Sequence, residues 1–193
     1  MNKGLKLTDI LVTVVIAIAF GIVYKLWGPL YYAVKPLGLH ADQLIYGMWF
    51  IAATVAFLII RKPGVALLAE TAAASGEFLM GSEFGLTVLL YGFIQGLFAE
   101  LVLAAFRYKR FDLLVVCLAG FGAGLGSLIM DFAYGEVGDL AAWNLTLFIV
   151  ARFVGAVLFT GVLAYYLVKA LEATGVTNLV RPATQEDFDA LDR

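Results

Sequence analysis

The sequence predicts an all-α integral membrane protein, a bundle of six transmembrane helices with both ends of the chain in the cytoplasm. The first observation is composition: the 193 residues are 63% hydrophobic and 15% charged, with a mean hydropathy of +0.95. A soluble domain is nearer half apolar and a quarter charged, and one globular core of this size cannot hide the surplus. The second observation is that the charged residues fall in clusters, and the third is the distribution of Lys and Arg. This composition excludes a soluble enzyme, a nucleic-acid binder and a disordered chain.

Long uncharged stretches define the predicted helices. Asp, Glu, Lys and Arg are absent from 10–24, 43–60, 84–99, 113–130 and 153–168. A helix crosses the bilayer core with about 20 apolar residues, and polar ends can extend to the interface. A further segment, 64–80, is apolar except for Glu70 and Glu77. Together these stretches predict helices at roughly 8–29, 43–60, 64–80, 85–106, 112–133 and 143–169.

Proline and charge placement support this arrangement. The four prolines fall at predicted helix ends or in loops, where they break no internal hydrogen bond: Pro29, Pro36, Pro63 and Pro182. Six crossings would put Lys25, Lys35 and Arg152 on the outer side of the membrane. The cytoplasmic side would then hold Lys3, Lys6, Arg61, Lys62, Arg107, Lys109, Arg110, Lys169, Arg181 and Arg193. This bias predicts cytoplasmic termini, with residues 1–175 as the membrane domain and 176–193 as a cytoplasmic tail.

Ionisable residues inside membrane helices are costly and usually face the protein interior. Here they are Glu70, Glu77, Glu100, Asp131 and Arg152. In one interpretation, Arg152 pairs with one acid and the other carboxylates bond to nearby hydroxyl or backbone groups. In the other, Glu77 and Asp131, both near outer helix ends, outnumber the available base and form a site for a cationic ligand.

Aromatic residues gather at the same outer level of the predicted bundle. Tyr46 and Trp49 share one face of the second helix because they are three residues apart. Such residues can form an interfacial belt, which is our interpretation of Tyr31 and Tyr32, or a stacking pocket for a flat or cationic ligand. Amide side chains on the outer halves of helices can bind ligands or join helices. The candidate ligand-binding residues are Glu77, Tyr46, Trp49, Asp131, Gln95, Asn144, Trp143 and Trp27.

Small residues mark places where helices can approach closely. The glycines at 120, 122, 124 and 126 favour packing inside the bundle, whereas Ala17 and Gly21 could equally face a partner protein. His40 is the single histidine, and no zinc-protease, serine-hydrolase or phosphate-loop motif occurs. We therefore predict no catalytic residue, metal site or cofactor, and no ATP site in this chain.

An ordered set of motifs resembles the YkoE family. It consists of Ile45-Tyr46-Gly47-Met48-Trp49-Phe50, Arg61-Lys62-Pro63-Gly64, Glu70, and Gln95-Gly96 with Ala99-Glu100. YkoE proteins are substrate-binding S components of energy-coupling factor (ECF) vitamin transporters. The resemblance, which runs from the first helix to Gly175, implies binding of thiamine or its hydroxymethylpyrimidine precursor (HMP) from outside. It also implies a transmembrane coupling protein, two cytoplasmic ATPases, and docking through Ala17 and Gly21, where the family commonly has Ala at the second position.

The residues suit that ligand, since aromatic faces and carboxylates favour a flat thiazolium cation and an aminopyrimidine. Two other classes remain open. One is an intramembrane enzyme that uses Glu70, Glu100 or Asp131 as acid and base. The other is a structural or assembly membrane protein whose outer aromatic residues are only a belt. The sequence does not distinguish thiamine from its pyrimidine precursor.

Overall fold

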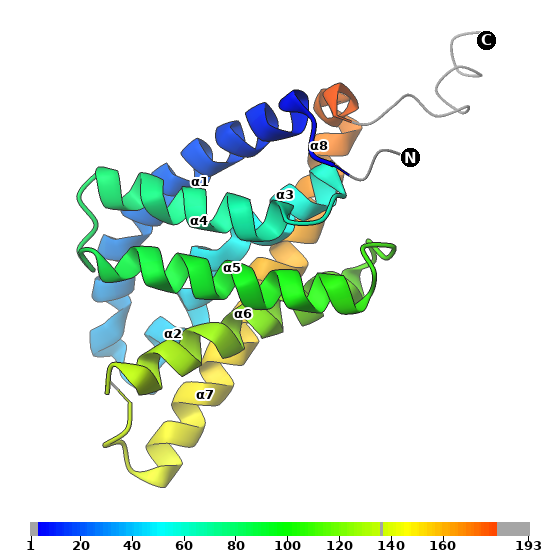
Figure 1. Ribbon diagram of the computed structural model, residues 1–193. Helices are drawn as coiled ribbons and strands as arrows, with labels where there is room; N and C mark the ends of the chain where they lie inside the picture. The colour runs from blue at the N-terminus through cyan, green and yellow to red at the C-terminus, as the bar shows by residue number, and fades with distance from the viewer. Residues whose placement is uncertain (1–3, 136, 181–193) are drawn as a thin grey trace, which may run out of the picture.

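The computed structural model describes residues 4–135 and 137–180, and every regular element among them is helical. The predicted tail therefore lies outside the described residues from position 181 onward. Figure 1 shows a bundle in which the elements follow in the order α1 (Leu7–Val34), η1 (Lys35–Leu37), α2 (Ala41–Ile45), η2 (Tyr46–Phe50), α3 (Ile51–Ile60), α4 (Val65–Leu79), α5 (Thr87–Ala105), α6 (Leu113–Ala133), α7 (Ala142–Ala156), η3 (Val157–Leu163), α8 (Ala164–Ala173) and η4 (Val176–Leu179).

The helices confirm the prediction of an all-α membrane protein. Among the described residues, five helical stretches are long and apolar enough to cross a bilayer: Leu7–Leu37, Ala41–Ile60, Thr87–Ala105, Leu113–Ala133 and Ala142–Ala173. The remaining predicted span is α4, which has 15 residues and carries Glu70 and Glu77. The start of α1 and the end of α8 lie at the same end of the bundle, at the top of Figure 1.

Helix α3 forms the centre of the bundle. All ten of its residues are buried, as expected for a helix that is apolar on every side. Helices α4, α5 and α6 lie side by side in Figure 1, and α5 packs against both of its neighbours. Helix α1 packs along α4, and the α7–η3–α8 span packs on α6 and α3.

The second span is not one regular α-helix. It changes to a 3-10 helix at η2 before α3 begins, so the first backbone N–H groups of α3 need partners inside the bundle. The N–H of Ala52 donates to the Tyr24 hydroxyl at 3.0 Å, and the N–H of Ala53 donates to Glu70 Oε2 at 3.2 Å. The Tyr24 hydroxyl donates to the same Glu70 oxygen at 2.9 Å. Two side chains from α1 and α4 therefore cap α3 in the protein interior.

The last span contains a π-helical stretch, η3, which packs directly on η2. The Thr160 hydroxyl donates to the Gly47 carbonyl at 2.6 Å, and the Thr54 hydroxyl donates to the Thr160 carbonyl at 2.6 Å. A Cβ added at Gly47 would lie 2.3 Å from the Gly155 carbonyl oxygen, so only glycine permits this crossing. The irregular parts of the two spans thus support each other through backbone contact.

Alternating glycines let α6 pack tightly against two neighbours, which confirms the predicted internal role. A Cβ at Gly120 would lie 2.9 Å from the Ala156 carbonyl oxygen of α7. A Cβ at Gly122 would lie 2.9 Å from the Phe98 carbonyl oxygen of α5. Residues four apart share a helix face, so Gly124 faces the α7–η3 side and Gly126 faces α5.

The structure corrects the predicted end of the first helix. Pro29 lies inside α1, which continues to Val34. Proline removes one backbone donor, but tertiary contacts beyond it compensate for that loss. Tyr31 is buried, and its hydroxyl accepts a hydrogen bond from Gln43 at 3.0 Å, which holds this last part of α1 against α2.

The structure also corrects the docking surface predicted at Ala17 and Gly21. Ala17 is 4% exposed, and the two residues face α4. A Cβ at Gly21 would lie 3.1 Å from the Ala73 carbonyl oxygen and 3.2 Å from the Gly76 Cα. The pair is used for packing inside the chain, because a groove of small residues accepts any helix and its spacing does not say which one.

We therefore expect Gly21→Leu to destabilise the isolated protein. The larger side chain would overpack the α1–α4 contact and cost roughly 1–3 kcal/mol. Thermal unfolding of the detergent-purified protein measures the effect. Ile22→Leu is the control, since Ile22 is exposed and should tolerate the change. A Gly21→Leu variant as stable as this control would argue against the packing role.

A second prediction concerns the cap on α3. Glu70 Oε1 has no hydrogen-bond partner among the described residues, while Oε2 accepts from both Tyr24 and Ala53. An amide oxygen can accept the same two bonds, so Glu70→Gln should unfold at a temperature close to that of the wild type. Glu70→Ala leaves a buried N–H without a partner and should lose about 1–3 kcal/mol. Equal damage from both substitutions would show that the charge, rather than the hydrogen bonds, matters.

Candidate ligand-binding cavity

A cavity of about 680 Å³ lies between α1, α2–η2, α4, α5, α6 and α7. Its size is within the range of small-molecule sites. Aromatic rings form much of the wall: Tyr24, Tyr31, Tyr32, Tyr46, Trp49, Phe84, Tyr91 and Phe148. The ionisable residues that line it are Lys35, His40, Asp42, Glu77, Asp131 and Arg152. The predicted combination of aromatic faces and carboxylates is therefore present in one cavity.

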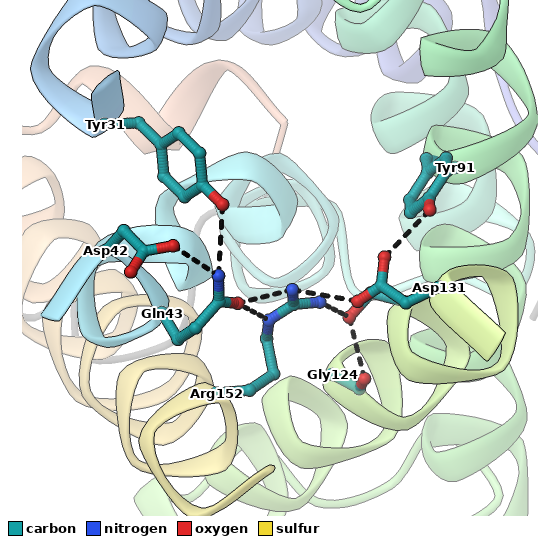
Figure 2. A network of polar contacts seen from close by, with 8 residues as sticks. Tyr31, Asp42, Gln43, Tyr91, Gly124, Asp131 and Arg152 are labelled. Atoms are coloured by element: carbon teal, nitrogen blue, oxygen red, sulfur yellow. Dashed lines mark hydrogen bonds and ion pairs between the residues drawn. The ribbon is translucent and has the colours of Figure 1, made fainter. Parts of the chain in front are cut away.

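Arg152 is the centre of a polar network on one wall of the cavity (Figure 2). This α7 side chain is 1% exposed, and its Nη2 pairs with Asp131 Oδ2 of α6 at 2.9 Å. Its Nη1 donates to the Ser127 hydroxyl at 2.6 Å, and its Nε donates to Gln43 Oε1 at 2.7 Å. Asp131 Oδ1 in turn accepts from the Tyr91 hydroxyl of α5 at 2.8 Å. The interpretation in which Arg152 pairs with one acid is confirmed, and that acid is Asp131.

Gln43 extends the network to α1. Its amide oxygen accepts from Arg152, while its amide nitrogen donates to Asp42 Oδ2 at 2.6 Å and to the Tyr31 hydroxyl at 3.0 Å. These partners fix the orientation of the amide, because its oxygen faces the N–H donors of Arg152 and its nitrogen faces the oxygens of Asp42 and Tyr31. Figure 2 shows the side chains of α1, α2, α5, α6 and α7 meeting in this network.

The ring of Tyr46 is already in contact with a cation of the protein. The Arg152 guanidinium carbon lies 3.5 Å from the centre of this ring and 5.1 Å from that of Phe148. Such stacking is favourable for a guanidinium, and it takes up part of the Tyr46 surface. Tyr46 thus lines the cavity and also holds Arg152 in place.

Glu77 and Trp49 bring unsatisfied polar atoms to the cavity wall. Glu77 is 2% exposed; its Oε1 accepts from the Ser82 hydroxyl at 2.9 Å, but its Oε2 has no hydrogen-bond partner among the described residues. The indole N–H of Trp49, which is 5% exposed, has no such partner either. The indole is close to the Glu77 carboxylate, but the two do not meet hydrogen-bond geometry. Buried polar atoms without partners are uncommon, so this pair marks a place where a ligand can bind.

Aromatic contacts hold the wall around Trp49. Its ring packs edge-on with Tyr31 at 5.3 Å and with Phe84 at 5.5 Å between ring centres. Tyr32 stacks on Phe84 at 6.1 Å. The interpretation of Tyr31 as part of an interfacial belt is wrong, since it is buried in this cluster and lines the cavity.

Most of the predicted binding residues meet in the cavity: Glu77, Tyr46, Trp49, Asp131, Gln95 and Asn144. Trp27 and Trp143 are not among its lining residues. The indole of Trp27 donates to the Ile45 carbonyl at 2.9 Å and packs on Phe159, while Trp143 is 65% exposed. Sequence reasoning did not identify Asp42 and Gln43, although Asp42 directly precedes the second uncharged stretch and Gln43 begins it, so this polar pair could have been noticed there.

Glu100 and Glu70 are also buried, but they do not line the cavity and their partners are structural. Glu100 of α5 accepts from the N–H groups of Gly64, Ala66 and Leu67 at 2.6, 3.0 and 3.2 Å. These groups begin α4, and a helix N-terminus favours a negative charge. Glu70 caps α3 as described above. Of the three acids considered for an intramembrane enzyme, Asp131 alone lines the cavity.

Comparisons with known proteins agree with this arrangement. Residues 8–126 match the family model described as the permease component of an ABC-type cobalt transport system. The chain is 36% identical over 177 residues to YkoE of Bacillus subtilis (strain 168), named as a candidate HMP/thiamine permease protein; the match covers 91% of this chain and 89% of that protein. A crystal structure of an S component of an ECF transporter superposes with a TM-score of 0.87 and 34% identity, over 91% of this chain and 89% of that one. The chain therefore belongs to the family of substrate-binding S components of ECF transporters that includes YkoE.

Proposed function

We propose that the protein captures thiamine or its hydroxymethylpyrimidine precursor in this cavity at the outer face of the membrane. The observation that carries the proposal is the pair of unsatisfied atoms, Glu77 Oε2 and Trp49 Nε1, in the cavity wall. An aminopyrimidine offers an amino donor to the carboxylate and a ring nitrogen to the indole N–H. The name of the B. subtilis relative refers to the same two compounds.

The charges of the cavity favour a cationic ligand. Asp131 is balanced by Arg152, and the remaining acids of the wall, Asp42 and Glu77, outnumber Lys35. Neither of these two acids has an ion-pair partner in the described part of the chain. A thiazolium ring would compensate this excess of acid and would stack on the aromatic wall. Gln95 lines the same cavity and adds a neutral amide that could accept or donate a hydrogen bond.

The description of the matching family model names cobalt, but the cavity chemistry favours an organic ligand. Within residues 4–135 and 137–180, no group of three or more His, Cys, Asp or Glu side chains could hold a metal ion. Aromatic rings, in contrast, are numerous in the wall. Flat organic rings gain from such surfaces.

Delivery into the cell would require an energised partner. The sequence has no phosphate-loop motif, so we infer that a membrane coupling protein and two cytoplasmic ATPases supply the energy. The loaded protein would reorient within this complex so that the cavity opens inward. No cofactor of its own and no catalytic residue is needed for this role.

The binding site can be tested by calorimetry with thiamine. Glu77→Gln replaces one carboxylate oxygen by an NH2 group and removes the negative charge. Trp49→Phe removes the indole N–H. Glu77→Gln should weaken binding by about ten- to a hundredfold, which corresponds to the loss of a charge-assisted hydrogen bond. Trp49→Phe removes a neutral hydrogen bond and should weaken binding by about two- to tenfold. Trp143→Phe is the control, because Trp143 lies outside the cavity, and its affinity should equal that of the wild type. Wild-type affinity in both cavity variants would reject this site.

Membrane orientation gives a separate test of the proposal. The end of the bundle where α1 begins carries the ion pairs Lys62–Asp9 and Arg61–Glu172. The positive-inside rule places this end in the cytoplasm. In a Cys117→Ala background, a cysteine at Asp139 should react with an impermeant thiol reagent in intact cells. A cysteine at Lys109 should react only after lysis, and the reverse pattern would overturn the orientation.

A further inference from the structure

The pairing of Arg152 with Asp131 has a consequence for which ligands the cavity accepts. Both side chains line the cavity, and they are 1% and 3% exposed. A buried guanidinium normally attracts anions, and arginine is well suited to phosphate because its planar group forms paired hydrogen bonds. Here Asp131 already occupies that position, with Nη2 and Oδ2 2.9 Å apart.

Asp131 supplies the balancing charge for this guanidinium. The other groups that accept from Arg152 are the Gln43 amide oxygen and the Ser127 hydroxyl, both of which are neutral. Asp42 is linked to Arg152 through Gln43 and forms no ion pair with it. Removal of the Asp131 charge would therefore leave a buried cation in the cavity wall without a counter-ion.

The position of Asp131 is set by its surroundings as well as by Arg152. Its Oδ1 accepts from the Tyr91 hydroxyl at 2.8 Å, and α6 is fixed between α5 and α7 by the close contacts of its glycines. The carboxylate is thus held against the guanidinium, and a phosphate that entered the cavity would have to displace it. It would also meet Asp42 and Glu77, which repel an anion and outnumber Lys35, the other cation of the lining.

We propose that Asp131 is a specificity-determining residue: by neutralising Arg152, it makes the cavity discriminate against phosphorylated ligands. The inference rests on the proposed function, since it assumes that an unphosphorylated thiamine-like molecule is the preferred ligand. Thiamine monophosphate is the matched probe, because it differs from thiamine by one phosphate group.

The test measures the dissociation constants of both compounds by calorimetry and takes the ratio of thiamine monophosphate to thiamine. For the wild type, the ratio should be at least about ten. Asp131→Asn keeps the shape of the side chain but leaves Arg152 unbalanced, and the ratio should fall at least about tenfold. Arg152→Gln has the opposite effect on charge, so its ratio should rise above that of the wild type.

The double variant Asp131→Asn, Arg152→Gln separates charge from shape. It has the same net charge as the wild type, and its ratio should return toward the wild-type value. Glu172→Gln is the control, because it removes one acidic charge at the opposite end of the bundle, where Glu172 pairs with Arg61. Its ratio should not change.

The outcomes distinguish the two proposals. If the wild type binds thiamine but the ratio is unchanged in Asp131→Asn and Arg152→Gln, the proposal about Asp131 is rejected and the proposed function stands. A double variant that keeps the ratio of Asp131→Asn would overturn the charge argument. If the unbalanced Asp131→Asn variant does not fold, the ratio for Arg152→Gln still tests the proposal: a rise supports it, and an unchanged ratio rejects it. Failure of the wild type to bind thiamine at all would instead reject the proposed function.

Discussion

The irregular backbone of the second span is the constraint on which the rest of the structure depends. A change from 3-10 to α-helix inside a membrane protein leaves polar groups that lipid cannot satisfy, so other parts of the chain must do so. Tyr24 and Glu70 accept the N–H groups at the start of α3, and Trp27 and Thr160 donate to the carbonyls of Ile45 and Gly47. These four side chains come from three other helices. Because they hold the break in place, the residues on either side of it, from Gln43 to Trp49, form one wall of the cavity.

Apart from Asp9, which pairs with Lys62, the buried charged residues divide into two groups according to what they bind. Glu70 and Glu100 accept backbone N–H groups at the start of a helix, and they stabilise the arrangement of helices. Asp42, Glu77, Asp131 and Arg152 line the cavity and bond chiefly to other side chains. A charged side chain inside a membrane helix is energetically costly, so it is found where it caps a helix or lines a cavity.

Much of this architecture follows from the sequence, but the details that shape the cavity do not. Gaps between charges locate the spans well, because the bilayer requires long apolar helices. They do not show that α1 continues past Pro29, since that depends on the contacts of Tyr31 with α2. The predicted depth in the membrane correctly grouped Glu77, Trp49 and Asp131, which all line the cavity. The same criterion also selected Trp27 and Trp143, which do not line it. The spacing of Ala17 and Gly21 identified a close helix contact but not its partner, because every helix of the bundle is a possible neighbour.

The glycines of α6 also bear on how this sequence can vary. Two faces of the helix touch the main chain or side chains of α5 and of the α7–η3 span so closely that an added methyl group would collide. Those faces have no side chain that could adopt another rotamer, so compensation by a second substitution nearby is difficult. Neutral change along α6 is then expected mainly at its exposed positions, such as Leu114, Leu125 and Ile129, where one apolar residue can replace another in contact with lipid. Mutational drift on this helix therefore leaves the location of Asp131, near its end, almost untouched.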